Sequence, residues 1–430
     1  MSNKIKCYVV NGEFVNDEYD SFDNIIKKIK KEILYNIPID AILGILNKFG
    51  KELTRDKKMI SQPGVLYLAQ WLRKSNLEQI IKVSIFDKKY LDIYLKNNGK
   101  AYLRAQSRGV VCHWVAGNIP TLALFSLIQS IICKNVNIAR VPLLSITPVL
   151  NILKVLQRIR VNHNNMAYSG ASMLKSISLI HFPSDDIRLN EQFSLNADCR
   201  VIWGGSEAIK SILALPQKEH CESIVFGPKY SFSVIDEDSA NRESANSLVK
   251  DTILFGQNAC SSPHIIFIET KSENKEASMI TVKKFAQKLA MAFNEYDRKF
   301  SVEITEINSR VINVRGAYLL DINKDIICSE DLKWTILCDN EVKLEEPVKS
   351  NTLYIKPVDC VYKIIPLITH KIQTIGIALS NSEKKMKFCE MSTAKGVSRC
   401  VKIGTMHNYE NPWDGILFMN RLVRWTIMRC

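Results

Sequence analysis

Residues 251–264 have the sequence DTILFGQNACSSPH, which places one cysteine, Cys260, among small and polar residues. The next four residues, 265–268, are Ile-Ile-Phe-Ile, an apolar run that predicts a buried strand. A cysteine in a polar loop directly before a core strand suits a thiolate nucleophile presented at a domain surface. A small packing residue at a strand entrance would give the same local pattern, because most free cysteines are packing residues. The surrounding sequence bears on the choice between these two interpretations.

Strands and helices alternate on both sides of this stretch. Before it, apolar runs predict strands at 110–115, 137–141, 177–182 and 200–203, with buried helices at 121–133 and 149–158. After it, we predict helices at 282–296, 364–372 and 416–428, and strands at 334–337, 352–355 and 374–379. Residues 223–235 predict two short strands around Gly227-Pro228, and residues 1–100 predict an accessory layer with helices over 22–49 and from Pro63. This alternation is typical of an α/β protein with parallel sheets.

Composition narrows the class of protein. The 430 residues are 46% hydrophobic and 24% charged, enough for two or more packed domains. The formal charge is 58 − 44 = +14, but the basic residues are scattered and not interleaved with aromatics, which argues against nucleic acid as a partner. Twelve cysteines without a CxxC pair and only seven histidines argue against a metal site.

Targeting and membrane segments are not predicted. The N-terminal residues are polar and of mixed charge, unlike a signal or transit peptide. The most apolar stretch, 121–133, is too short and too polar to cross a bilayer. We therefore expect a soluble cytoplasmic protein with no membrane span.

A glycine pair and a serine, Gly204-Gly205-Ser206, stand between the strand at 200–203 and a helix that begins near Glu207. Free backbone N–H groups and the helix dipole at such a turn favour a phosphate group. A plain turn with Ser206 as the helix N-cap would explain the same residues.

Four segments share a wider pattern: HWVAGNIP at 113–120, FGPKYS at 226–231, FGQNACSSP at 255–263, and a tail with GTM at 404–406, PWDG at 412–415 and LVRW at 422–425. In this order they resemble the aldehyde dehydrogenase superfamily, and best its LuxC-like branch, the bacterial fatty acyl-CoA reductases. The resemblance covers roughly residues 100–430. It implies an aldehyde dehydrogenase-like α/β fold, with a Rossmann-like cofactor domain at 1–240, to which 405–430 returns, and a catalytic domain at 241–404.

The resemblance also implies roles for individual residues. Cys260 matches the nucleophile that takes an acyl group from a thioester, and Asn118 matches the asparagine that holds the oxyanion. Arg140 stands where the superfamily contacts the cofactor ribose, and an arginine there could hold the 2′-phosphate of NADPH. Gly205 and Ser206 match the loop near the cofactor pyrophosphate. Alternatives remain open: Asn118 as a turn residue before proline, and Arg140 as a surface cation at a strand end.

One departure from the superfamily pattern concerns Val225. Relatives that hydrolyse their acyl-enzyme carry a glutamate base at the matching position, just before the turn that is here Phe226-Gly227-Pro228-Lys229. Cys260 follows 260 − 225 = 35 positions later, which is about the family spacing. Without a base to activate water, the acyl-cysteine should persist until it is reduced.

We therefore expect an NADPH-dependent acyl thioester reductase that forms an aldehyde through an acyl-cysteine. The acyl donor would be acyl-CoA or an acyl-carrier or acyl-transferring partner protein, and a homo-oligomer is expected. Two alternatives stay open: a reductase of a short or biosynthetic acyl group on a carrier protein, and a catalytically silent homologue that acts as a subunit of a complex. His264, Trp413 and Asp414 have no predicted chemical role and are expected to be structural.

Overall fold

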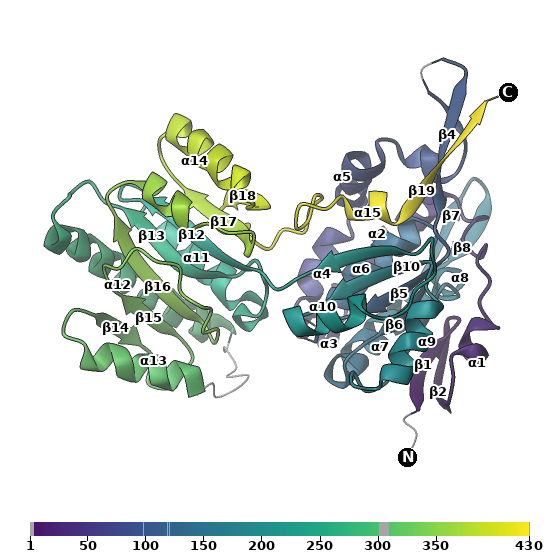
Figure 1. Cartoon of the computed structure of the whole chain (residues 1–430), viewed down its shortest axis with the longest axis horizontal. Helices are drawn as coiled ribbons and strands as arrows, with labels where there is room; N and C mark the ends of the chain where they lie inside the picture. The colour runs from purple at the N-terminus through teal and green to yellow at the C-terminus, as the bar shows by residue number, and fades with distance from the viewer. Residues whose placement is uncertain (1–3, 98, 118, 120, 301–308, 430) are drawn as a thin grey trace. The chain divides into compact units, whose positions relative to one another are not determined.

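The computed structural model describes residues 4–97, 99–117, 119, 121–300 and 309–429. The chain divides into two units: unit 1 contains Met1–Gly227 and Tyr409–Cys430, and unit 2 contains Pro228–Asn408. Each has a central sheet with helices around it (Figure 1). The boundary between Gly227 and Pro228 falls in the turn that the sequence predicts between two short strands. The two strands exist, but they belong to different sheets.

The main sheet of unit 1 has seven strands. Their spatial order is β11 (Glu222–Phe226), β10 (Cys199–Trp203), β5 (Val110–Trp114), β6 (Val136–Arg140), β9 (Ile177–His181), β1 (Ile5–Val10) and β2 (Glu13–Tyr19). The five strands from β11 to β9 are parallel. Starting at β5, the chain first builds outward through β6 and β9, then returns to the other side of β5 with β10 and β11. This is the doubly wound order, in which ligands bind where the strand order reverses, outside the carboxyl ends of the strands.

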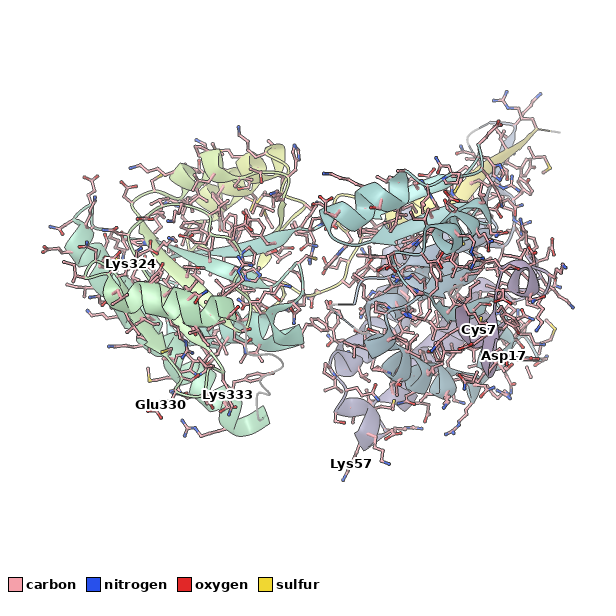
Figure 2. The ribbon with its side chains drawn as sticks, turned by 60° about the horizontal axis from the view of Figure 1, so that its bottom comes forward. Cys7, Asp17, Lys57, Lys324, Glu330 and Lys333 are labelled. Carbon is pink, nitrogen blue, oxygen red and sulfur yellow. The ribbon has the colours of Figure 1, made fainter. Side chains whose placement is uncertain are left out.

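A hairpin that we did not predict extends this sheet. Strands β1 and β2 pair antiparallel, and β1 pairs antiparallel with β9. The turn is Asn11-Gly12, with φ values of 50° and 81°, the sequence that a tight two-residue hairpin prefers. Cys7 and Asp17 face each other across the two strands (Figure 2). Burial, followed by the charge of Asp17, raises the pKa of the Cys7 thiol to about 12, so this cysteine is a packing residue.

Helices of unit 1 cover this sheet and its N-terminal layer. They are α1 (Asp23–Ile26), α2 (Ile39–Leu53), α3 (Lys57–Ile60), α4 (Val65–Trp71), α5 (Lys74–Ile85), η1 (Lys88–Leu91), α6 (Leu122–Ile132), α7 (Leu143–Gln157), α8 (Gly170–Leu174), α9 (Ile187–Leu195), α10 (Ser206–Leu213) and α15 (Phe418–Arg421). Unit 1 also contains a two-stranded hairpin, β7 (Arg160–His163) and β8 (Met166–Ser169). The helical pattern expected over 22–49 forms two helices with a gap between them: α1 ends at Ile26, and α2 begins after Pro38.

The C-terminal segment is not the helix that we predicted over 416–428. Only Phe418–Arg421 is helical, and Val423–Arg429 forms strand β19. This strand pairs antiparallel along its whole length with β4 (Ala101–Ser107), which also pairs with β3 (Leu95–Lys96). In Figure 1, β4 and β19 extend together from the unit and carry the C-terminus. The partner strand lies more than 300 positions away, so pairing in the folded chain overrides the local helical pattern.

Unit 2 also has a seven-stranded sheet. The order is β14 (Asp325–Cys328), β15 (Thr335–Cys338), β16 (Thr352–Val358), β13 (Pro263–Glu269), β12 (Tyr230–Asp236), β17 (Ile372–Ala378) and β18 (Arg399–Lys402). All neighbours are parallel except β14 and β15. Strand β13 is buried at every position, with Phe267 packed on one face and Ile266 and Ile268 on the other. The strand predicted at 265–268 is therefore confirmed as a central strand covered on both faces.

The helices of unit 2 are α11 (Arg242–Ile253), η2 (Leu254–Gln257), α12 (Lys275–Phe300), α13 (Ser309–Leu320), η3 (Val361–Leu367) and α14 (Ser382–Ala394). The helix expected at 364–372 is instead the short 3-10 helix η3. Pro366 lies inside it and lacks the N–H group that a longer α-helix would need. Strand β17 then begins at Ile372, two residues earlier than predicted.

Candidate active site

The loop before Cys260 has an unusual backbone. Three consecutive residues, Phe255, Gly256 and Gln257, have positive φ values of 61°, 58° and 59°. Two of them carry side chains, for which this left-handed conformation costs about 1–3 kcal/mol each. The conformation persists only if the surrounding structure fixes it, and the contacts of Gln257 do so.

Gln257 is fully buried and connects the loop to strand β16. Its side-chain amide donates to the carbonyl oxygens of Pro263 at 2.9 Å and Thr352 at 2.8 Å. Its side-chain oxygen accepts from the backbone N–H of Thr352 at 2.8 Å. These bonds satisfy backbone groups at the starts of two neighbouring parallel strands, β13 and β16, and they hold the loop against the sheet.

Cys260 lies between the end of this loop and β13, and it is half-buried and not in a disulfide. Its carbonyl oxygen accepts a hydrogen bond of 2.7 Å from the hydroxyl of Ser231, the second residue of β12. The same Ser231 oxygen accepts from the backbone N–H of Thr374 at 3.0 Å. The peptide that follows the predicted nucleophile is thus fixed through two other strands of the sheet.

Ser261, next to Cys260, contacts a histidine that we did not predict as a site residue. The Ser261 hydroxyl lies 2.8 Å from Nδ1 of His407, and Nε2 of His407 lies 2.6 Å from the carbonyl oxygen of Asp251. All three residues are buried. Burial lowers the pKa of His407 to about 4 and raises the pKa of the Asp251 carboxyl to about 7. The imidazole is therefore neutral near pH 7.

The structure gives His264 a packing role. It is buried on β13, and its Nδ1 has no hydrogen-bond partner in the part of the chain that is described. Burial lowers its pKa to about 3, so it stays neutral in the folded protein. Trp413 is also buried, and its ring stacks on Tyr409 with the centroids 4.5 Å apart. Both observations agree with the structural roles expected for these residues.

The residues predicted to bind the cofactor lie at one edge of the unit 1 sheet. Gly205 and Ser206 follow β10, Arg140 ends β6, and residues 115–117 follow β5, which lies between these two strands. All three segments are at carboxyl ends of parallel strands, and the order of the strands reverses at β5 and β10. Asn118, the predicted oxyanion residue, lies outside the described residues.

Gly205 and Ser206 form an open helix start. Gly205 precedes α10, and no side chain caps the first turn of this helix. A Cβ atom added at Gly205 would meet nothing within 4 Å, and Ser206 is exposed. Ser206 is the first helical residue, so the alternative in which it is the N-cap is wrong. The helix therefore begins with backbone N–H groups that no side chain covers.

Arg140 is more constrained than a surface cation. Its Nε and Nη2 atoms donate to the carbonyl oxygen of Phe182 at 3.1 and 3.0 Å. Its guanidinium lies over the Phe182 ring, 5.4 Å from the centroid. The remaining nitrogen, Nη1, makes no hydrogen bond to the described residues. Arg140 is therefore a partly buried cation at the strand end that is held against Phe182.

Val225 lies on the edge strand β11, one residue before its end. It pairs with Ile202 of β10 and packs, half-buried, against the core of unit 1. It lies in unit 1, and Cys260 lies in unit 2. The valine side chain has no group that can accept a proton.

Four residues that support Cys260 were not predicted as site residues: Ser231, Asp251, Gln257 and His407. Asp251 and Gln257 lie close to the cysteine in the sequence, but no local sequence feature indicates which hydrogen bonds they make. Ser231 and His407 are 29 and 146 positions away from their partners. In the sequence, His407 is marked only as a single histidine in the polar stretch 407–411.

Within the described ranges, no group of three or more His, Cys, Asp or Glu side chains could hold a metal ion. Among the same residues, no helix is both long and apolar enough to span a bilayer.

Known structures with a similar fold include several aldehyde dehydrogenases. The aldehyde dehydrogenase KauB from Pseudomonas aeruginosa superposes with a TM-score of 0.71 at 11% identity, covering 99% of this chain and 96% of that one. Lactaldehyde dehydrogenase from Escherichia coli gives a TM-score of 0.65 at 11% identity, with 99% and 98% covered. The predicted aldehyde dehydrogenase-like α/β fold is thereby confirmed.

Sequence comparison identifies relatives and a family. A long-chain acyl-protein thioester reductase of Vibrio harveyi is 24% identical, covering 97% of this chain and 92% of the relative. A protein of the same name from Aliivibrio fischeri is 26% identical, covering 77% of this chain and 65% of the relative. The family model described as acyl-CoA reductase (LuxC) matches residues 34–425. The match spans nearly the whole chain, including most of the N-terminal layer, and it shows that the protein belongs to the LuxC family of acyl-CoA reductases, oxidoreductases of the acyl thioester reductase type.

Proposed function

We propose that the protein reduces a protein-bound or CoA-bound acyl thioester to an aldehyde, with NADPH as the reductant and acyl-Cys260 as the intermediate. Unit 1 would bind the cofactor and unit 2 would carry the nucleophile. The observation that carries the proposal is the Cys260 loop. A half-buried thiol follows a left-handed backbone segment, and buried hydrogen bonds from Gln257 and Ser231 hold the loop on both sides of it.

The chemistry at Cys260 divides one thioester reduction into two transfers. The Cys260 sulfur attacks the acyl carbonyl, the new carbon–sulfur bond forms, and the donor leaves as its free thiol. By resemblance, the amide of Asn118 and the Cys260 backbone N–H hold the oxyanion that develops, and such a donor is worth about 3 kcal/mol of barrier. Cys260 then holds the acyl group, and its thiolate is released again when the aldehyde leaves.

The cofactor supplies hydride when it is bound, and unit 1 fits its phosphates. The first turn of α10 lacks a side-chain cap, and the absence of a Cβ at Gly205 leaves space over it. Backbone N–H groups at such a helix start bind phosphate, and the turn lies where the strand order of the sheet reverses. Gly205 and Ser206 would therefore hold the pyrophosphate.

Arg140 is the residue proposed to favour NADPH over NADH. Two of its nitrogens are used by the Phe182 carbonyl, which fixes the plane of the guanidinium. Nη1 would then meet the 2′-phosphate as a single charged donor. The preference should accordingly be smaller than for a fully available arginine.

The absence of a base at Val225 favours reduction over hydrolysis. Valine cannot take a proton from water, so the acyl-Cys260 thioester should last until the reductant acts on it. The names of the Vibrio harveyi and Aliivibrio fischeri relatives favour a long-chain acyl group on a protein as the donor. The net charge of +14 would suit an acidic partner.

The test is intact-mass measurement after incubation with a panel of acyl-CoAs and acyl-carrier proteins without NADPH. We expect a mass increase of one acyl group that hydroxylamine removes, and aldehyde release when NADPH is added. Cys260→Ala should lose both the adduct and the aldehyde, whereas Cys7→Ala, a change at a deeply buried thiol, should keep them. An adduct that persists in Cys260→Ala would assign the nucleophile to another cysteine, and no adduct with any donor would contradict the proposal.

A further inference from the structure

A second loop of unit 2 contacts the nucleophile loop. It runs from Gly404 to Asn408, after strand β18, and carries the buried His407. Gly404 has a φ of 84°, which allows the chain to turn there, and its N–H donates to the carboxylate of Asp251. This contact fixes the start of the loop on the end of helix α11, the helix that leads into the cysteine loop.

The hydrogen bonds of His407 define its protonation. A carbonyl oxygen can only accept, so the 2.6 Å contact with Asp251 requires the proton on Nε2. Because the ring is neutral, Nδ1 carries a lone pair, and the Ser261 hydroxyl at 2.8 Å must donate to it. Both ring nitrogens are therefore occupied, and neither is available to take the Cys260 proton directly. His407 can act on Cys260 only through Ser261.

A second set of bonds ties the other side of Cys260 to the same loop. Ser231 donates to the Cys260 carbonyl and accepts from the N–H of Thr374. The Thr374 hydroxyl accepts from Arg399 at 3.3 Å. The Arg399 guanidinium also donates to the carbonyls of Met406 at 3.1 Å and Asn408 at 2.8 Å, the two residues that flank His407.

The two sets of bonds form one continuous hydrogen-bond network that includes Cys260. One chain of bonds leads from Cys260 through Ser261 to His407, and the other leads through Ser231 and Thr374 to Arg399. Both chains of bonds end at residues 406–408. The ring of Phe255, in the left-handed segment, packs edge-on against His407 with the centroids 5.5 Å apart. The position of the Cys260 peptide is thus determined from both sides by the loop that carries His407.

We infer that His407 is a positioning residue for acyl transfer, which acts through the hydroxyl of Ser261 to hold Cys260 in the orientation needed to attack the thioester. The inference rests on the proposed function, because it concerns the rate at which Cys260 becomes acylated. A misplacement of about 1 Å can cost roughly a hundredfold in rate, so loss of the Ser261–His407 bond should be visible in the chemical step.

Two substitutions of the histidine separate its two bonds. In His407→Asn, the side-chain oxygen takes the place of Nδ1 and can still accept from Ser261. In His407→Gln, the side-chain amide reaches the place of Nε2 and can still donate to Asp251. Ser261→Ala removes the hydroxyl, and Ser261→Thr keeps it.

The experiment is single-turnover acylation by tetradecanoyl-CoA, followed by intact mass, with NADPH affinity and thermal midpoint measured on each variant. We expect Ser261→Ala and His407→Gln each to slow acylation about tenfold to hundredfold, with unchanged NADPH affinity. Their double variant should be no slower than either one. His407→Asn and Ser261→Thr should stay within about threefold of the parent rate, since they keep the bond that carries the effect.

The outcomes distinguish the two proposals. If the parent protein forms no adduct with this donor or with the wider panel, the proposed function fails. If the parent is acylated but Ser261→Ala and His407→Gln react at the parent rate, the positioning role is overturned while the function stands. If His407→Asn and His407→Gln slow equally and in step with their thermal midpoints, His407 only stabilises the fold, and the inference is also overturned.

Discussion

In unit 1 the residues expected to bind the cofactor follow their strands, whereas in unit 2 the expected nucleophile precedes its strand. Gly205 and Arg140 lie at carboxyl ends of parallel strands, and Cys260 lies before the amino end of β13. Helices begin after the carboxyl ends of strands in such sheets, so uncovered N–H groups and the positive end of the helix dipole are available there. No comparable set of backbone donors is provided at the amino ends.

The two edges are therefore built in different ways. At the carboxyl edge of unit 1, the proposed cofactor site depends on the absence of two groups: a Cβ atom at Gly205 and a side-chain cap on α10. At the amino edge of unit 2, side chains hold the loop, with Gln257, Ser231 and His407 each bonded to backbone or side-chain groups of other segments. A ligand-binding edge can stay open, but a nucleophile must be held in place before its substrate arrives.

Val225→Glu would place a carboxylate base near the end of β11, and we expect the largest effect here. A positioned general base is worth roughly 10²–10⁴ in rate, so hydrolysis of preformed acyl-Cys260 without NADPH should rise by that order. Acyl-enzyme lifetimes measured by mass spectrometry across pH test this, with Val225→Gln as the control that has no base. Equal lifetimes for a folded Val225→Glu protein and its parent would show that the valine does not set the reductase direction.

Gln257→Leu should break the amino-edge loop. The change removes the side-chain donor to the carbonyls of Pro263 and Thr352, while the N–H of Thr352 keeps its bond to the carbonyl of Lys349. Each unpaired buried group costs about 1–3 kcal/mol, so the loss of two such bonds should lower the free energy of unfolding by roughly 2 kcal/mol or more. Urea unfolding measures it, and Gln287→Leu, at an exposed position of α12, is the matched control. A loss below about 0.5 kcal/mol would mean that other contacts fix the loop.

The contrast between the edges also explains what the sequence can predict. Alternating apolar segments predicted most strands of both sheets, because a buried strand needs a local apolar run whatever its neighbours are. Strand β19 was missed because its stability comes from pairing with β4, far away in the sequence. The open turn at Gly205 was predicted, because glycines between a strand and a helix are visible in the local sequence. The bonds of Ser231 and His407 to the Cys260 loop were not, because the topology of unit 2 alone brings these distant polar residues together.

Gly205→Val should show the opposite behaviour to Gln257→Leu. The added side chain meets no protein atom at its Cβ, so the free energy of unfolding should change by less than about 0.5 kcal/mol. It would, however, occupy space proposed for the cofactor phosphates, and NADPH should bind about tenfold more weakly, a loss of about 1.4 kcal/mol. Titration of cofactor fluorescence measures this, with Gly316→Val, another glycine with open space, as the control. Parent affinity in Gly205→Val would remove this turn from the cofactor site.

Asp251→Asn should have the smallest effect. It alters the carboxyl group that holds the start of the loop carrying His407. Burial raises the pKa of Asp251 to about 7 against the weaker opposing effect of backbone N–H donors from Gly404 and Met406. The unfolded carboxyl has a pKa of about 3.9, so between these values the folded chain keeps a proton that the unfolded chain has released. The contribution of this carboxyl to the free energy of unfolding is therefore fully present below about pH 4. It is lost as the pH rises toward 7, by at most about 1.4 kcal/mol per pH unit. Asparagine does not titrate but can still accept from Gly404.

Urea unfolding of the parent and of Asp251→Asn between pH 6 and 8 isolates this contribution, because the other titrating groups are common to both proteins. The stability of the parent relative to the variant should be greatest at pH 6, decline by about 1–2 kcal/mol in all, and level off above pH 7. A difference that is flat with pH would mean that Asp251 is already ionised in the folded protein throughout this range. The turn at Gly404 would then rest on a charged carboxylate, and the amino-edge loop would be supported by charge as well as by neutral hydrogen bonds.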